Sequence, residues 1–324
     1  MNLKIQIPAI LICFCAILSM VLLPFTAASA PTAQAVTDTA SPIEDHAIRF
    51  LVMGCDNSGR LTDSILVVAV EKGSGAVNLL QIPRDTYANY TARDYKKING
   101  AWSLLGGEGI KSLYSDVLGV RIHYFSILTL SGFRAFVDAM DGVDVEIPMD
   151  MRYEDPDQGL EIRLSAGLHH LNGRAAEQFV RFRSGYANAD LGRLDAQKQF
   201  LRAVAKKSKS LSPVLLCRVM GIALTNLQTD FPLPQGMQAL SAVRNCNVEQ
   251  IGMETLPGQA IQGSSGAWYY SANREGLCRA VNQLLFPPQA LSLEEVDPKG
   301  LLDRKENADF HAIYNAPEER LPLE

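Results

Sequence analysis

Short runs of apolar residues, separated by turn-forming residues, mark the first half of the chain. The runs at 48–53, 64–70, 77–82 and 123–128 are rich in aliphatic and β-branched side chains and are too short for typical helices. We therefore expect four buried β-strands there. The segment 143–147 alternates apolar and acidic residues, which is typical of a strand with one face on the core and one face in water.

Longer segments carry apolar residues at helical spacing. One of them, 99–118, is interrupted by Gly106 and Gly107 and is expected to form a helix in two parts. The remaining expected elements are strands at 160–164 and 248–255 and helices at 132–140 (capped by Ser131), 172–178 (capped by Asn172), 190–207, 213–225, 233–243 and 273–286. Strands and helices are mixed and do not repeat, so the pattern predicts one α/β domain over residues 46–288.

The two ends of the chain differ from this domain. Residues 5–23 carry no charge and lie at the border of membrane-spanning length, and small residues of the kind that signal peptidase accepts follow at 26–30. Residues 1–45 are therefore expected to be a signal peptide or membrane anchor plus a flexible Ala/Thr/Pro/Ser-rich tether. Either alternative exports the rest of the chain. Residues 289–324 are polar and charged and are expected to form a poorly ordered tail.

Composition narrows the possible functions. The chain has 324 residues, of which 47% are hydrophobic, and a net charge of −5, so it has no overall attraction to nucleic acid. It has no phosphate-binding Gly-rich Lys-Ser/Thr loop, no His-Glu-x-x-His and no Cys-x-x-Cys. Four cysteines remain outside the leader, and export permits a Cys246–Cys278 bridge, with buried free thiols as an equal alternative.

Two clusters of polar residues indicate a binding site for an anion. Arg181 and Arg183 stand two residues apart, so an extended backbone would direct both guanidinium groups to one side. From a helix cap at Asp190, Arg193 and Gln197 fall on one helical face. Guanidinium groups match pairs of phosphate oxygens. The alternative is a solvated surface with ordinary salt bridges.

Three further polar sets follow the predicted strands and the start of a helix. The loop after 48–53 contains Asp56 and Asp63, Arg84 and Asp85 follow 77–82, and a third set includes Lys97 and Asn99. Ligands gather at the carboxyl ends of strands in open α/β sheets. Carboxylates among arginines suit a magnesium ion beside phosphates, because this cation prefers oxygen ligands and bridges phosphoryl oxygens. Each set alone also fits structural ion pairs.

Together these sets resemble the LytR-CpsA-Psr family of cell-envelope proteins. The shared motifs span residues 48–205, with Leu256-Pro257-Gly258 fitting the family's end. They are Gly54-x-Asp56, Thr62-Asp63-Ser64, Ile82-Pro83-Arg84-Asp85-Thr86, Lys97-Ile98-Asn99, Asp141-Gly142-Val143-Asp144-Val145, Gly167-x-x-x-Leu171-Asn172-Gly173-x-Ala175, Arg181-Phe182-Arg183 and Asp190-x-Gly192-Arg193-x-x-x-Gln197. The resemblance implies an α-β-α sandwich with a single mixed central sheet.

The resemblance also implies an activity. Family members are taken to be phosphotransferases that move a glycopolymer, such as teichoic acid, from a polyprenyl-diphosphate carrier to peptidoglycan. A chain of this kind would use Mg²⁺ and would lie at the cell membrane with an extracellular domain, or be secreted if its leader is cleaved near Ala30. Its partners would be the lipid-linked glycopolymer, peptidoglycan and, through an uncleaved N-terminus, the membrane, but no nucleic acid.

The resemblance assigns roles to individual residues. It implies a catalytic set of Arg84, Asp85, Arg181, Arg183 and Asp190. It implies pyrophosphate or lipid binding by Arg84, Lys97, Asn99, Arg181, Arg183, Arg193 and Gln197, and metal binding by Asp56 and Asp63. Asp85 and Asp190 would orient arginines or assist proton removal.

The chain departs from the family pattern at two positions. Leu61 and Ala196 stand where family members often have arginine. These departures leave open a second function, that of a non-catalytic envelope protein which binds polyprenyl phosphate. A membrane-linked transcription regulator is disfavoured by the acidic pI, the export signal and the lack of a recognisable DNA-binding helix pair.

Overall fold

The structure is a computed structural model of the chain. It describes residues 45–303 except for 56–58, 73, 75, 92–95, 156–159, 183–195, 197–198, 201, 205, 208–209, 233–250 and 264–265. The expected leader and tether, the expected helix at 233–243 and most of the segment 183–198 therefore lie outside the described residues.

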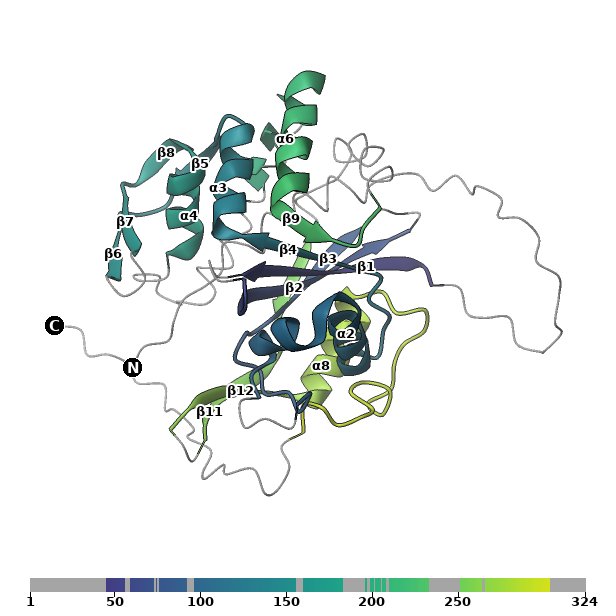
Figure 1. Ribbon diagram of the computed structural model, residues 1–324. Coiled ribbons are helices and arrows are strands. Elements are labelled where there is room, and N and C mark those ends of the chain that lie inside the picture. The colour runs from purple at the N-terminus through teal and green to yellow at the C-terminus, as the bar shows by residue number, and fades with distance from the viewer. Residues whose placement is uncertain are drawn as a thin grey trace, which may run out of the picture.

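A six-stranded mixed sheet forms the centre of the domain (Figure 1), as the sequence predicted. Its strand order is β10-β3-β2-β1-β4-β9. The strands are β1 (Ala47–Cys55), β2 (Thr62–Glu71), β3 (Val77–Ile82), β4 (Tyr124–Thr129), β9 (Leu227–Thr229) and β10 (Gly252–Thr255). β1 pairs parallel with β4, β3 pairs parallel with β10, and β2 runs antiparallel between β1 and β3.

The central strands are apolar on both sides because helices cover both faces of the sheet. Along β1, Phe50 and Val52 pack into one core cluster, whereas Leu51 and Met53 pack into the other. Helices α3, α4 and α6 lie on the first face, and α2 and α8 lie on the second (Figure 1). This arrangement is the predicted α-β-α sandwich.

The helices begin and end where local chemistry allows. Their bounds are α2 (Ala101–Leu118), α3 (Leu130–Ala139), α4 (Gly173–Arg181), α6 (Pro213–Asn226) and α8 (Arg274–Leu284), with a short 3-10 helix η1 (Ile98–Gly100) before α2. The predicted break in the first of these is real, since Gly106 has φ 63° and ψ −170°. The expected cap Ser131 is wrong: Thr129 accepts the hydrogen bond from Gly132, so α3 starts earlier.

Three two-stranded sheets extend the domain. The pair β5 (Val143–Ile147) and β8 (Gly167–Leu171) lies with the pair β6 (Met151–Asp155) and β7 (Leu160–Leu164) on the side of α3 and α4 (Figure 1), and the third pair is β11 (Gly258–Gln262) with β12 (Trp268–Ala272). β5 alternates buried and exposed residues, as predicted. β6, β8, β9, β11 and β12 were not predicted.

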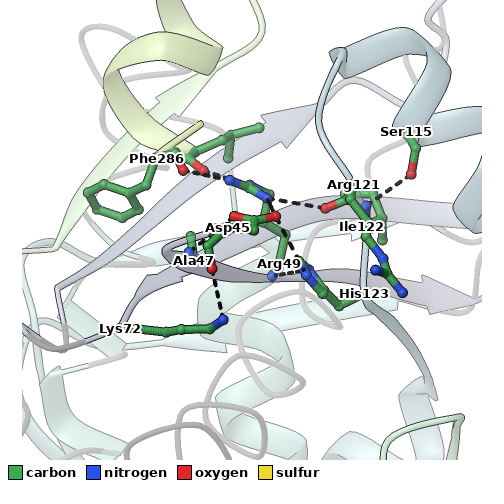
Figure 2. Close-up of polar contacts among 10 residues, drawn as sticks. Asp45, Ala47, Arg49, Lys72, Ser115, Arg121, Ile122, His123 and Phe286 are labelled. Atoms are coloured by element: carbon green, nitrogen blue, oxygen red, sulfur yellow. Dashed lines mark hydrogen bonds and ion pairs between the residues drawn. The ribbon is translucent and has the colours of Figure 1, made fainter. Parts of the chain in front are cut away.

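One charged side chain is completely buried in the sheet. Arg49 of β1 donates from Nε to the carbonyl of Leu285 (2.7 Å), from Nη2 to that of Phe286 (2.5 Å) and from Nη1 to Asp45 (2.8 Å), as Figure 2 shows. The backbone N–H of Arg49 donates to Nδ1 of His123 (3.1 Å). The guanidinium therefore ties the start of β1 to the end of α8.

The polar segment after α8 is packed rather than disordered as far as residue 303. Val296 is fully buried and Leu302 nearly so, both in the core cluster that contains α2 and α8. Two backbone N–H groups, of Leu301 and Leu302, donate to the carboxylate of Asp297. The expectation of a disordered tail from residue 289 is therefore wrong for 289–303, because scattered apolar residues in a polar segment suffice to hold it.

Two further findings bear on the sequence predictions. Cys278 has a free thiol, which fits the free-thiol alternative rather than a bridge to Cys246, a residue outside the described part of the chain. Within the described residues, no helix has the length and apolar character needed to cross a membrane.

Candidate active site

The sheet topology brings the predicted polar sets to one edge. β1, β3, β4 and β10 run in the same direction, so their carboxyl ends meet there. Cys55 at the end of β1 pairs with Thr62 at the start of β2 and with Thr129 at the end of β4. The residues that follow β3 and precede β2 are therefore neighbours at this edge, as expected for a ligand site in an α/β sheet.

Arg84 is held between two carboxylates at the end of β3. Its Nη1 donates to Oδ1 of Asp63 at 3.0 Å, and its Nε lies 3.7 Å from Oδ2 of Asp85. All three side chains are mostly buried. Asp63 comes from the start of β2, so the ion pair links two antiparallel neighbours and fixes the direction of the guanidinium.

Lys97 completes a second ion pair with the same loop. Its ammonium donates to Oδ1 of Asp85 at 2.7 Å. It also lies 5.6 Å from the centre of the Tyr269 ring. Asp85 thus stands between a guanidinium and an ammonium, with one carboxylate oxygen near each.

Asn99 stabilises the backbone of this region. It is buried, its backbone N–H donates to the carbonyl of Arg84 (3.2 Å), and its carbonyl accepts from the hydroxyl of Thr62 (3.2 Å). These contacts join the loop after β3 to the start of β2. These backbone contacts serve the shape of the site, and the ligand-binding role that the resemblance implied for Asn99 stays a prediction.

Arg181 approaches the same edge from the other face of the sheet. α4 runs antiparallel to α3, because the N–H of Gly173 donates to Asp138 (2.7 Å) and Glu177, one turn later, lies 3.4 Å from Arg134. A further turn brings Arg181 level with the start of α3, which follows Thr129 at the carboxyl end of β4.

The environment of Arg181 differs from the sequence prediction. The sequence places it after the helix in an extended segment, but it occupies the last turn of α4, and the next residue, Phe182, is extended. Its guanidinium is buried and donates to Oε1 of Glu177 at 2.8 Å. The helix continues because Phe179 and Val180 pack into the core, which outweighs their weak helix propensity.

Five predicted site residues lie outside the described part of the chain. They are Asp56, Arg183, Asp190, Arg193 and Gln197. The two residues that depart from the family pattern lie within the described part of the chain. Leu61 is partly exposed, whereas Ala196 is buried in the core cluster with α3 and α4.

Other residues of the site were not identified from the sequence. Glu177, which binds both Arg181 and Arg134, could have been found from its spacing four residues before Arg181. Tyr269 and Tyr270 come from the unpredicted β11–β12 hairpin, and no local pattern connects them to residues 85–97. Only the tertiary structure reveals that contact.

The described part of the site has three cations, and each contacts a carboxylate. The pairs are Arg84 with Asp63, Lys97 with Asp85, and Arg181 with Glu177. Burial, with a smaller contribution from Tyr269, raises the pKa of Tyr87 beside them. Across the described residues, no three or more His, Cys, Asp or Glu side chains are placed to hold a metal ion. Guanidinium and ammonium groups are the side chains that commonly bind phosphate oxygens.

A sequence profile decides the family. The profile of the LytR_cpsA_psr family matches residues 24–284, which is most of the chain. The chain belongs to this family. The LytR_cpsA_psr domain thus includes the central sheet and the polar edge at its strand ends.

Individual relatives agree with this assignment. A polyisoprenyl-teichoic acid–peptidoglycan teichoic acid transferase, TagU of Bacillus mycoides (strain KBAB4), is 28% identical over 243 residues, covering 72% of this chain and 76% of the relative. The crystal structure of TagV of B. subtilis is 23% identical with a TM-score of 0.60, covering 79% of this chain and 98% of that one. The protein Lin1025 of Listeria innocua is 27% identical with a TM-score of 0.58, covering 74% and 96%.

Proposed function

We propose that this protein transfers a glycopolymer from a polyprenyl-diphosphate carrier to a hydroxyl group of peptidoglycan. The observation that carries the proposal is the fixed guanidinium of Arg84, held by Asp63 and Asp85 at the carboxyl edge of the sheet. Membership of the LytR_cpsA_psr family and the name of the TagU relative support it. The site supports this substrate class, because guanidinium and ammonium groups recognise concentrated phosphate charge.

The proposed reaction is a phosphoryl transfer. The acceptor hydroxyl oxygen forms a bond to the phosphorus that carries the glycopolymer, the bridging P–O bond of the diphosphate breaks, and polyprenyl phosphate leaves. The hydroxyl proton passes to a carboxylate, for which Asp85 is the described candidate. Arg84 and Lys97 stabilise the charge that develops on the phosphate oxygens.

We propose that Mg²⁺ would be bound jointly by carboxylates of the protein and phosphate oxygens of the substrate. Mg²⁺ is often bound by only one or two carboxylates together with substrate phosphates, and it would neutralise charge on the diphosphate. Asp63 offers one carboxylate at the edge of the sheet, and Asp56, seven residues earlier, would supply the second. The carboxylates of Asp63 and Asp85 offset the charges of Arg84 and Lys97, so an additional cation would help to neutralise the diphosphate.

We also propose that the protein acts at the outer side of the cell membrane. The uncharged segment 5–23 and the small residues at 26–30 support export, with either membrane anchoring or cleavage near Ala30. A polyprenyl carrier is embedded in a bilayer, so a site for its diphosphate group must work near a membrane surface.

A purified-protein assay tests the proposed activity. We expect Arg84→Ala to lower the rate of transfer from a lipid-diphosphate-linked glycan to peptidoglycan by about 100- to 1,000-fold, the range for loss of one charge-stabilising group. Arg163→Ala is the matched control, because Arg163 is exposed and pairs with Glu154 and Glu161 on β6 and β7. The fold of each variant is checked by its thermal unfolding midpoint.

The same assay separates the two functions. The alternative, a lipid-binding protein without turnover, is favoured by Leu61 and the buried Ala196, which stand where family members often have arginine. Retention of labelled polyprenyl phosphate without transfer in the presence of magnesium would establish this alternative. Equal transfer by wild type and Arg84→Ala would contradict the assigned site.

A further inference from the structure

The β11–β12 hairpin is attached directly to the loop that carries Arg84 and Asp85. The N–H of Tyr270 donates to the carbonyl of Asp85 (2.8 Å), and the N–H of Tyr87 donates to the carbonyl of Tyr270 (2.8 Å). The Tyr270 hydroxyl donates to the carbonyl of Leu256 (2.6 Å), beyond the end of β10. The hairpin is therefore fixed relative to both the loop and the sheet.

This attachment determines where the neighbouring tyrosine points. Successive side chains of a strand alternate between its two faces, so Tyr269 projects opposite to Tyr270. Its ring meets the Tyr87 ring at a centre-to-centre distance of 6.0 Å and an angle of 71°. The Lys97 ammonium lies 5.6 Å from the centre of the same ring.

The ring and a carboxylate therefore both contact Lys97, and they act differently on its charge. Asp85 binds the ammonium at 2.7 Å and carries a full negative charge. An aromatic face attracts a cation through its quadrupole without adding a formal charge. A second carboxylate in place of Tyr269 would hold the ammonium equally well but would repel a diphosphate.

We propose that Tyr269 is a positioning residue that, together with Asp85, restrains the Lys97 ammonium at the edge where the diphosphate would bind, without adding a second negative charge beside it. The inference rests on the proposed function for the identity of the ligand. A lysine side chain has four rotatable bonds, and ordering it on binding is costly. Restraining it beforehand against a rigid ring lowers that cost and strengthens binding.

Three variants of Tyr269 separate electrostatics from packing. Phenylalanine keeps the ring face, a fluorinated phenylalanine keeps the shape but weakens the quadrupole, and leucine removes the ring. We expect Tyr269→Phe to bind inorganic pyrophosphate within about twofold of wild type, and Tyr269→Leu and the fluorinated variant to bind about 5- to 10-fold more weakly. Titration calorimetry measures the dissociation constants.

A double-mutant comparison connects the effect to Lys97. Tyr269→Leu should have no further effect on pyrophosphate binding in a Lys97→Met background, because the group that it positions is gone. In the transfer assay, Tyr269→Leu should raise the KM for the lipid donor with little change in kcat. If Tyr269 served only for packing, the fluorinated variant would bind pyrophosphate like Tyr269→Phe, and Tyr269→Leu would weaken binding equally with and without Lys97→Met.

The outcomes are distinguishable from those of the proposed function. Pyrophosphate binding that depends on Tyr269 as described, without any glycan transfer, would support the positioning role and refute the transferase. Equal binding by wild type, Tyr269→Leu and the fluorinated variant would overturn the positioning role whether or not transfer occurs. If Tyr269→Leu does not fold, the binding constant of the shape-conserving fluorinated variant decides between these outcomes.

Discussion

At the scale of single residues, Arg49 stabilises the fold through a buried charge. Arg49 lies within an apolar run and reads from sequence as the polar member of a strand, yet its side chain is fully buried. Backbone carbonyls of Leu285 and Phe286, more than 230 residues away, accept its hydrogen bonds. No local pattern contains those partners, so the sequence predicts the strand but not the role of its arginine. The same holds for Lys97 and its contact with Tyr269.

His123 beside this arginine should make the fold sensitive to acid. Burial lowers the pKa of His123 from 6.5 to about 4, although Asp45 nearby favours the charged form. Its Nδ1 accepts the N–H of Arg49, which only the neutral ring can do. The unfolded chain binds a proton at higher pH than the folded chain, so stability is complete above pH 6.5 and is lost as pH falls toward 4.

The expected loss is up to about 3 kcal/mol between these pH values, at about 1.4 kcal/mol per pKa unit. Urea unfolding at pH 7 and pH 4.5 measures it. His123→Asn keeps an acceptor near Nδ1 and does not titrate, so it should lose less stability over this interval than wild type. His170→Asn, which alters an exposed pair with Asp144, should behave like wild type. Parallel pH curves for wild type and His123→Asn would contradict the assignment.

Asp45 titrates outside this interval. Burial alone would raise its pKa, but the hydrogen bond and charge of Arg49 lower it below 3.8. Its contribution to stability is therefore present above that value and is lost only at more acidic pH, below the interval in which His123 acts.

Elements of this fold differ in how well sequence predicts them. The apolar strands β1 to β4 are buried on both faces, so composition alone marks them. The hairpin β11–β12 is short, β11 is mostly exposed and β12 is half exposed, and β11 contains Gly, Gln and Ala, which carry little strand signal. The sequence therefore does not predict this hairpin or the support that it gives to the 85–87 loop.

The packing of α4 against α3 determines the position of Arg181. Gly173 is packed against the backbone of Arg134, so that a Cβ atom there would overlap its carbonyl oxygen. We expect Gly173→Ala to separate the two helices, to lower the free energy of unfolding by about 1–3 kcal/mol and to reduce transfer activity. Urea unfolding and the transfer assay check both effects.

Gly221 provides the matched control for this change. It is exposed in α6, and apart from its chain neighbours and the backbone of its own helix no atom of the described residues lies within 4 Å of the position where a Cβ would stand. Gly221→Ala should leave activity unchanged and raise stability by about 0.5–1 kcal/mol, since alanine favours a helix more than glycine. A Gly173→Ala variant as stable and as active as Gly221→Ala would show that the helices tolerate the added methyl group.

In the molecule as a whole, the residues of the apolar core and the residues of the proposed active site lie in different places. Both core clusters are apolar and lie on the two faces of the sheet, whereas the cation–carboxylate pairs lie at its edge. The site could be predicted as a set of motifs, but its distances could not, because four of its described residues come from β2, the loop after β3 and the turn before α2. Five more of its predicted members lie outside the described residues.

Removal of magnesium should therefore stop transfer without unfolding the protein. A metal held by one or two carboxylates plus substrate phosphates binds weakly to the protein alone, so it adds little to stability. We expect EDTA to abolish transfer, added Mg²⁺ to restore it, and the thermal unfolding midpoint to stay the same. Full transfer in EDTA would exclude the proposed metal, and a fall in the midpoint would indicate a structural one.

The buried guanidinium of Arg49 fixes the start of β1, where the chain enters the domain. This end of the strand is opposite the active edge. Arg49 lies near the start of β1 and Cys55 at its end. The nine residues of β1 span about 30 Å at about 3.3 Å each. If the leader remains as a membrane anchor, the tether of residues 31–44 must cover the length of β1 for the active edge to face the lipid. Fully extended, fourteen residues reach about 50 Å at most. A fully extended tether would exceed the length of β1 by about 20 Å, so an anchored chain could still turn its active edge toward the bilayer.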